Sequence, residues 1–307
     1  MFLSSRLLPV LVVLAFSVPA PAGSGNPVAD ANGPVTLRFA WPSKFEARVQ
    51  YHRVKQETGK PQAELSLTPR LIVSPEGKGY RVAYRRWMEG RSEDPLIRLS
   101  FEILEQITSV IDEHGALVRI EGSERVAEVA DKIPGIEKVP PETRRQLATL
   151  GPRIAERDQS DLWNSLVGNW SGSELEIGKE KITETSVPIA ALGVTIRYHV
   201  RQVAVRRLPC PGATSRTCVQ LEMNTKPEAA DLERFVKDQV AKLGFENANK
   251  LLSQLDTTAQ VELTTEPETL LPHFLRIKRI TGARAGNGTE SVRTERVDIQ
   301  EYSYTFE

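Results

Sequence analysis

The sequence has few of the residues from which reaction centres are usually built. Its 307 residues include two cysteines and four histidines. The histidines, His52, His114, His199 and His273, are scattered along the chain and show no HExxH or HxH spacing. Metal sites and metal-dependent catalytic sites are recognised in a sequence by such spacings. We therefore expect neither a metal ion nor a cofactor.

The chain also lacks an excess of charge and, beyond its first residues, a long apolar run. Forty lysines and arginines balance forty aspartates and glutamates. Nucleic-acid binding needs a basic excess or stripe, so we expect no nucleic-acid partner. No later stretch approaches the roughly 18 uninterrupted apolar residues typical of a membrane-spanning helix. This predicts a protein without a transmembrane segment once the export signal is removed.

Two short motifs resemble functional loops but have the wrong spacing. Gly168–Gly172 reads GNWSG, which is GxxSG and not the GxSxG of a nucleophile elbow. Gly282–Gly288 reads GARAGNG and has neither the GxGxxG spacing of a phosphate-binding loop nor a helical pattern after it. We interpret both as structural loops, so the sequence predicts no catalytic residues.

The first 22 residues predict export. Arg6 gives a positive start, Leu7–Phe16 is an apolar core, and Ala20–Ala22 is an A-x-A cleavage pattern. The apolar core is shorter than the roughly 20 residues that a membrane-spanning helix needs. We expect a signal peptide over 1–22, a flexible leader over 23–34, and a periplasmic or secreted protein.

The two cysteines predict a structural disulfide. Cys210 and Cys218 lie too far apart for a CxxC redox pair, and no histidine lies near them in the sequence to complete a metal site. An exported chain meets an oxidising compartment, in which such a pair forms a disulfide. The bond would close a hairpin of two strand-like runs, 194–208 and 217–223.

Side-chain alternation in this hairpin predicts a register and a bulge. If the cysteines face each other, Val205 lies opposite Met223. The apolar side of the first strand then changes from even-numbered to odd-numbered residues. A strand cannot change sides without an extra residue, so we expect a β-bulge between Val200 and Val203.

Alternating apolar and polar residues predict a first β-rich part over 35–121. The expected strands are 35–41, 45–52, 63–73 with a bend at Pro69, 79–87, the start of 96–111, and a hairpin around the turn 112–115. A type I turn is expected at Ser74–Gly77, where proline and glycine occupy the preferred positions. Neighbouring strands joined by short turns form an antiparallel meander.

Helical spacing replaces the alternation over 123–167. We expect a short helix from Ser123 to about Lys132. A second helix is expected over 142–150, which Gly151 and Pro152 interrupt before it resumes over 153–167. Gly168 stands where a C-terminal cap is expected.

Strands return over 173–306, with one long helix among them. Thr225 and Glu228 have the spacing of a capping box, so a helix is expected over 225–244, with Leu232 and Phe235 on its apolar face. Strands are expected at 257–265, 273–281 and 290–306, the last two joined by a loose turn at Gly282–Gly288.

The order of the elements predicts an α+β fold with a mainly antiparallel sheet. Each strand group has one apolar face and the helices are amphipathic. We therefore expect a curved, half-barrel-like sheet packed against amphipathic helices. Residues 35–307 are expected to form a single domain, and two subdomains that divide near residue 168 are the alternative.

These features favour an exported, soluble, non-enzymatic protein that binds an apolar or amphipathic ligand between the sheet and the helices. The candidate partners are a lipid or small apolar molecule, or another protein of the cell envelope. The aromatic residues that could line the site, or equally fill a core, are Tyr51, Tyr84, Trp163, Tyr198 and Phe235. Two alternatives remain. One is a structural or interaction module of the cell envelope, and the other is a hydrolase that uses two carboxylates in a cleft.

Overall fold

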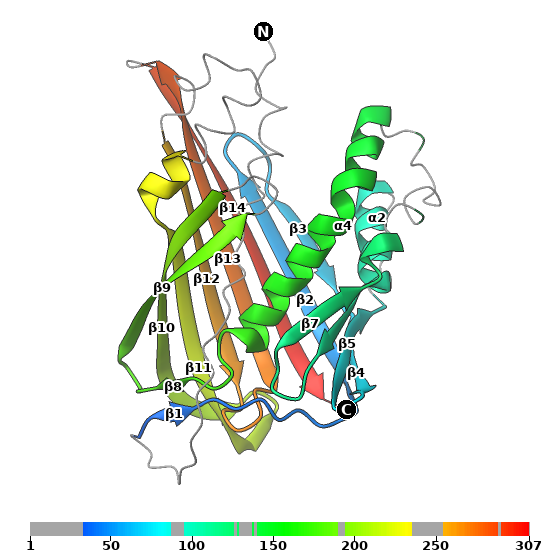
Figure 1. Ribbon diagram of the computed structural model, residues 1–307, viewed down its shortest axis with the longest axis vertical. Coiled ribbons are helices and arrows are strands. Elements are labelled where there is room, and N and C mark those ends of the chain that lie inside the picture. Colours follow the sequence, from blue (N-terminus) through cyan, green and yellow to red (C-terminus); the bar gives the residue numbers. More distant parts are fainter. Residues whose placement is uncertain are drawn as a thin grey trace.

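The structure is a computed structural model (Figure 1). It describes residues 33–86, 95–125, 128, 137, 140–189, 194–234, 254–287 and 290–306. The expected signal peptide, almost all of the expected leader, and Phe235 lie outside these residues. They stay predictions.

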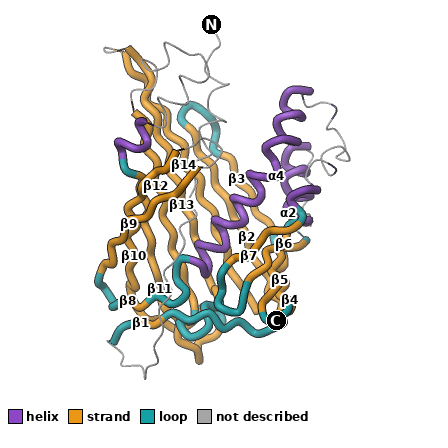
Figure 2. Tube along the Cα trace, viewed as in Figure 1, coloured by secondary structure: helices purple, strands orange, loops and turns teal. Residues whose placement is uncertain are grey.

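One antiparallel sheet of 12 strands makes up most of the molecule (Figures 1 and 2). The first β-rich part supplies β2 (Phe45–Glu57), β3 (Ala63–Leu67), β4 (Arg70–Glu76), β5 (Gly79–Arg85), β6 (Thr108–Ile111) and β7 (Leu117–Glu121). The second supplies β9 (Glu180–Ile189), β10 (Val194–Cys210), β11 (Ala213–Pro227), β12 (Gln254–Thr265), β13 (Pro272–Asn287) and β14 (Glu290–Phe306). The order is β7-β6-β5-β4-β2-β14-β13-β12-β11-β10-β9, and β3 also pairs with β2. Strands from both parts of the chain therefore share one sheet, which β2 and β14 join in the middle.

The fold is mainly β, which corrects the expected α+β class. The helices of the described part are few: α2 (Pro95–Gln106), α4 (Pro141–Trp163) and short turns such as η2 (Ser123–Arg125). The sheet is open, with β7 and β9 at its two ends. Several strands are longer than the alternating stretches that predicted them. They extend into neighbouring segments whose sequences are typical of turns. Within the described residues, no helix combines the length and the apolar character needed to cross a membrane.

The expected antiparallel meander is confirmed in most of its strands. β2 pairs with β3 through its second half and with β4 through its first, and Pro69 lies between the two partners. The hairpin of β6 and β7 turns at Gly115, which has a φ of 87° that suits glycine. The turn between β4 and β5 is at Gly77, beyond the expected position, because Ser74 still pairs with Arg81.

Two expectations for the helical segments are wrong. The start of 96–111 forms the helix α2 and not a strand, and Pro95 occupies its first residue, where proline is favoured. Residues 142–167 do not break at Pro152, which lies inside the continuous helix α4. An interior proline costs roughly 3 kcal/mol, and the burial of Leu162 and Trp163 near the end of α4 offsets it. The helix then continues as the π-helical turn η4 (Asn164–Gly168).

The disulfide hairpin has a different register from the expected one. The disulfide itself is confirmed, with an S–S distance of 2.06 Å. However, Cys218 pairs with Leu208, and the bulge lies at Val205 and not between Val200 and Val203. The expectation failed because it placed polar Gln202 outside. Gln202 is buried on the apolar side of β10, where its Nε2 donates to the backbone oxygen of Asn169 at 2.8 Å.

Two further expectations about loops and caps are wrong. Thr225 belongs to β11 and is buried there, so it does not cap a helix. A helical turn begins after Glu228, whose backbone N–H donates to the oxygen of Arg197. The rest of the expected helix lies outside the described residues. Gly282 continues β13 and pairs with Glu295 of β14, so the loose turn expected from residue 282 is absent up to Asn287.

The hydrophobic core lies on one side of the sheet, which we call the inner face. Figure 1 shows α4 crossing this face diagonally. At the lower end of the view, β1 (Val35–Thr36) pairs with β8 (Glu174–Leu175), and the chain beyond β1 is tied to distant loops. The indole of Trp41, for example, donates to the backbone oxygen of Leu270 at 3.0 Å. The lower inner face is therefore covered by α4, its π-helical end and this N-terminal segment.

Candidate functional site on the inner face of the sheet

The inner face changes from apolar to charged along the strands. Residues in direct register on antiparallel strands point to the same face. A lower row across six strands is apolar or aromatic: Ala204, Leu221, Leu263, Leu275, Tyr302 and Tyr51. Two rows higher on the same face, the register is Val200, Thr225, Ala259, Arg279, Asp298 and Lys55. The second row begins apolar on β10 and ends charged on β13, β14 and β2.

Asp298 is held by Arg53 in a two-point ion pair. Arg53 Nε donates to Oδ1 at 2.8 Å, and Nη2 donates to Oδ2 at 2.5 Å. Burial pushes the pKa of Asp298 upward, but the hydrogen bonds and charge of Arg53 outweigh it, so the pKa is lowered. Asp298 is therefore a firmly ionised group that is already occupied by its arginine.

Asp161, from the last turns of α4, faces the same row. Its side chain is 3% exposed, and Oδ2 accepts from Nη2 of Arg279 at 3.3 Å. Its Oδ1 and the Nε of Arg279 are buried without a hydrogen-bond partner among the described residues. Burial raises the pKa of Asp161 to about 7, and the positive charge of Arg279 lowers it only in part. The site thus holds a carboxyl group that changes protonation near neutral pH.

Two cations of this region make no direct ion pair in the described part of the chain, although the charges of Asp298 and Asp158 act on Lys55. Lys55 of β2 and Arg296 of β14 form no ion pair there, although both are only partly exposed. Burial, followed by the charge of Arg53, lowers the pKa of Lys55. The nearby Glu57 is taken by Lys60, with Nζ 2.6 Å from Oε1. We call the group Arg53, Lys55, Arg279, Arg296, Asp161 and Asp298 the charged band.

Two of the five aromatic candidates border the charged band. Tyr51 is buried beside Arg53, and burial raises its pKa to about 12. Tyr198 is also buried, and burial with the charge of Asp161 raises its pKa to about 12. A role in ligand binding stays a prediction for both residues, because each is also packed in the interior.

The other candidates lie elsewhere. The hydroxyl groups of Tyr84 and Tyr304 are 2.9 Å apart in a buried tyrosine cluster. Trp163 packs edge-on against Trp41 at the lower end of the core, and its indole donates to the backbone oxygen of Gly115 at 2.9 Å. Phe235 is outside the described residues. The structure therefore does not gather the five around one site.

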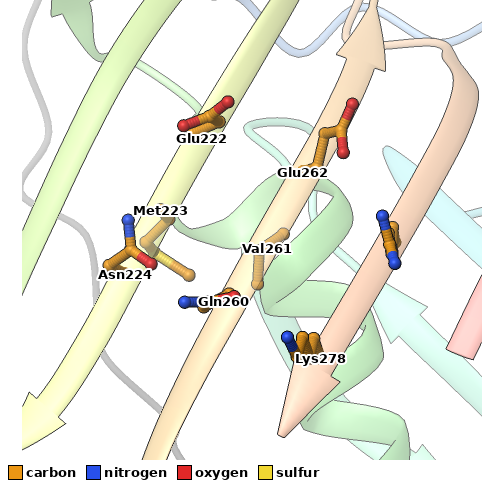
Figure 3. A pocket seen from close by; sticks show the side chains of 8 residues that line it. Glu222, Met223, Asn224, Gln260, Val261, Glu262 and Lys278 are labelled. Atoms are coloured by element: carbon orange, nitrogen blue, oxygen red, sulfur yellow. The ribbon is translucent and has the colours of Figure 1, made fainter. Parts of the chain in front are cut away.

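A hollow of about 290 Å³ lies on the opposite, outer face of β11, β12 and β13 (Figure 3). In this view α4 lies behind the strands. Glu222 and Glu262 are in direct register, and Lys278 lies on the next strand. Gln220 Nε2 donates to Glu262 at 3.0 Å. The side chains around it are mostly polar and of both charge signs, so the hollow does not favour an apolar ligand.

The disulfide has a histidine neighbour that the sequence did not indicate. Ligand atoms of Cys210, Cys218 and His273 all lie within 4.8 Å of one another, and all three residues are buried. His273 is also 3.1 Å from the backbone oxygen of Pro211 and 3.1 Å from Glu266 Oε1. Because the two sulfur atoms are bonded to each other, they are not thiolate ligands for a metal ion.

Sequence reasoning missed every member of the charged band, although a signal was present. On β2, the apolar positions Val49 and Tyr51 are followed at the same spacing by Arg53 and Lys55. On β13, Leu275 and Ile277 are likewise followed by Arg279. Charged residues that continue the buried side of a strand could have marked the site. Asp161 gave no comparable signal.

No protein-family model matches this chain, and no curated protein matches it. Among solved structures, one described as "lipid-protein interactions in lipovitellin" aligns with 86% of this chain at 10% sequence identity and a TM-score of 0.40. The aligned part is 25% of that chain, so this protein spans a quarter of its length. A likeness of this size supports no conclusion about fold or ligand.

Proposed function

We propose that this chain is an exported, non-enzymatic protein that binds an amphipathic ligand on the inner face of its sheet. One observation carries the proposal. Within a single register row, apolar Ala259 adjoins charged Arg279 and apolar Val200 lies two strands beyond Ala259. The polar atoms of the Arg279–Asp161 pair are buried without full hydrogen bonding. Buried polar groups are normally satisfied, so an additional partner at this position is favoured.

The disulfide supports the exported location. Such bonds persist in oxidising compartments and are rare in the cytosol, and Cys210 and Cys218 are the two cysteines of the chain. The apolar character of the first residues points the same way. A periplasmic or secreted protein of this kind would carry or hold its ligand and would not transform it.

Native mass spectrometry of protein purified from its own cells tests the proposal. We expect a co-purifying amphiphile, and after its removal a long-chain probe such as oleyl alcohol should bind and change tryptophan fluorescence. The variant Ala259→Leu adds volume to the inner face and should weaken binding. Gln260→Leu changes the exposed neighbour on the outer face and is the matched control. Protein that stays folded but neither contains nor binds any amphiphile contradicts the proposal.

One observation favours a second candidate, a hydrolase with a pair of carboxylates. Asp161 and Asp298 both interact with Arg279, and their pKa values are shifted in opposite directions, as in acid–base pairs. Against it, both oxygens of Asp298 are occupied by Arg53. Turnover of nitrophenyl glycosides or esters that disappears in Asp161→Asn would support this candidate, and no turnover above that variant would exclude it for those substrates.

A further inference from the structure

We propose that the ligand is a lipid with an anionic head group, and that Lys55 and Arg296 bind this head group with help from Arg279. The inference rests on the proposed function and adds the chemical class of the ligand. It is carried by the register of β2, β14 and β13 and by the ion pairs of the charged band.

The three cations share one face and are near neighbours. Asp298 lies in register between Arg279 on one side and Lys55 on the other. Arg296 is two residues before Asp298 on β14, so it points to the same face and is diagonal to Lys55. Diagonal neighbours on antiparallel strands are about 7–8 Å apart, within reach of long side chains. One carboxylate or phosphate group can therefore meet more than one of these cations.

The acidic residues nearby do not fully neutralise the cations Lys55, Arg296 and Arg279. Asp298 is engaged by Arg53 at both oxygens, and Asp161 is engaged by Arg279. Because the pKa of Asp161 is about 7, it is partly protonated near neutral pH and supplies less than a full negative charge. Two more acids lie close by: Glu57, in register with Arg296, is paired with Lys60, and Asp158, whose charge acts on Lys55, is paired with Arg157. Counted with these partners, six cations face four acids. A partly buried charge without a partner is costly, and an anion at this point removes that cost.

The apolar half of the row argues for a lipid and against a free anion. Ala259 adjoins Arg279 directly, and Val200 lies two strands further along the same row. Tyr198 is two residues before Val200 on β10 and thus on the same face, near Asp161. A lipid whose anionic group binds Lys55 and Arg296 and whose apolar chain extends toward β10 would contact both the charged and the apolar part of the row. A free phosphate ion would contact only the charged part.

Titration of the delipidated full-length protein with three probes tests the inference. The probes are sodium oleate, oleyl alcohol with the same chain but no charge, and inorganic phosphate. We expect oleate to bind at least tenfold more tightly than oleyl alcohol, with an affinity that falls as salt rises. Phosphate alone should bind more weakly than oleate.

Variants identify the residues. Lys55→Gln and Arg296→Gln should each weaken oleate binding severalfold and should together abolish the preference for oleate over oleyl alcohol. Lys278→Gln removes a cation from the outer face of β13 and should change neither affinity. Thermal unfolding curves confirm that each variant is folded.

The possible failures are distinct. Equal binding of oleate and oleyl alcohol by the unmodified protein, or an oleate preference that survives both substitutions, overturns the anionic anchor and leaves the proposed function in place. Phosphate that binds as tightly as oleate overturns the lipid and indicates a site for free anions. Binding of neither long-chain probe overturns the proposed function itself.

Discussion

Replacing Asp161 by asparagine should change how the stability of the protein depends on pH. The carboxyl group is 3% exposed, and its pKa is about 7 in the fold against 3.8 for the ordinary group. Each pKa unit corresponds to ~1.4 kcal/mol, so a shift of this size is worth about 4 kcal/mol. The folded state binds the proton more tightly than the unfolded chain. This contribution is therefore fully present below about pH 4 and is lost as the pH rises toward 7.

Urea unfolding at closely spaced pH values from 4 to 8 measures this effect. The unmodified protein should lose free energy of unfolding over that window, and Asp161→Asn should lose about 4 kcal/mol less because asparagine has no proton to release. Asp158→Asn is the matched control, since Asp158 is on the same helix but 53% exposed. Parallel pH profiles for Asp161→Asn and the unmodified protein would refute the assignment of a buried, proton-binding carboxyl group.

Four more variants test the packing and pairing described above. Gly115→Ala should lower stability by roughly 2 kcal/mol or more in chemical denaturation, because a Cβ would lie 2.7 Å from Phe39 Cγ at a φ of 87°. Gly77→Ala, at positive φ in open space, should cost only about 1 kcal/mol. Asp298→Asn should cost about 3 kcal/mol, because it leaves a partly buried arginine without its charge partner; an unchanged denaturation midpoint would contradict this. The double variant Cys210→Ala, Cys218→Ala should unfold with about 2–3 kcal/mol less free energy, and reduction should then no longer affect the melting temperature, as it does in the unmodified protein.

The sequence predicted those strands whose two sides differ clearly in polarity. β2 and β14 alternate over most of their length, so their positions were evident. α2 was mistaken for a strand because its apolar residues satisfy both periods at once, and only Pro95 at its start distinguishes the two. Pro152 was interpreted as a helix breaker, but α4 continues through it because tertiary packing stabilises the helix. The local pattern failed where it fitted two structures at once, as in α2, or where tertiary packing competed with it, as at Pro152.

The charged residues of β2 and β13 each carried a local signal, but the charged band could not be assembled from it, because its members meet only through the sheet. Arg53 and Asp298 are 245 positions apart in the sequence, and Asp161 reaches them from a helix between the two β-rich parts. Gln202, a polar residue on the buried side of β10, was taken as exposed. This error also shifted the predicted register of the disulfide hairpin. Alternation identifies the side of a strand, but it does not identify which strands will be neighbours.

The join between β2 and β14 has a consequence for how the chain reaches its native state. β2 is among the first strands to be synthesised, and its partner β14 is the last. Until β14 is available, β2 and β13 each have an unpaired edge. Contacts between such distant segments slow folding, and open edges invite pairing with other chains. A chain whose sheet closes this late benefits from a holding chaperone that covers the two open edges until β14 is available.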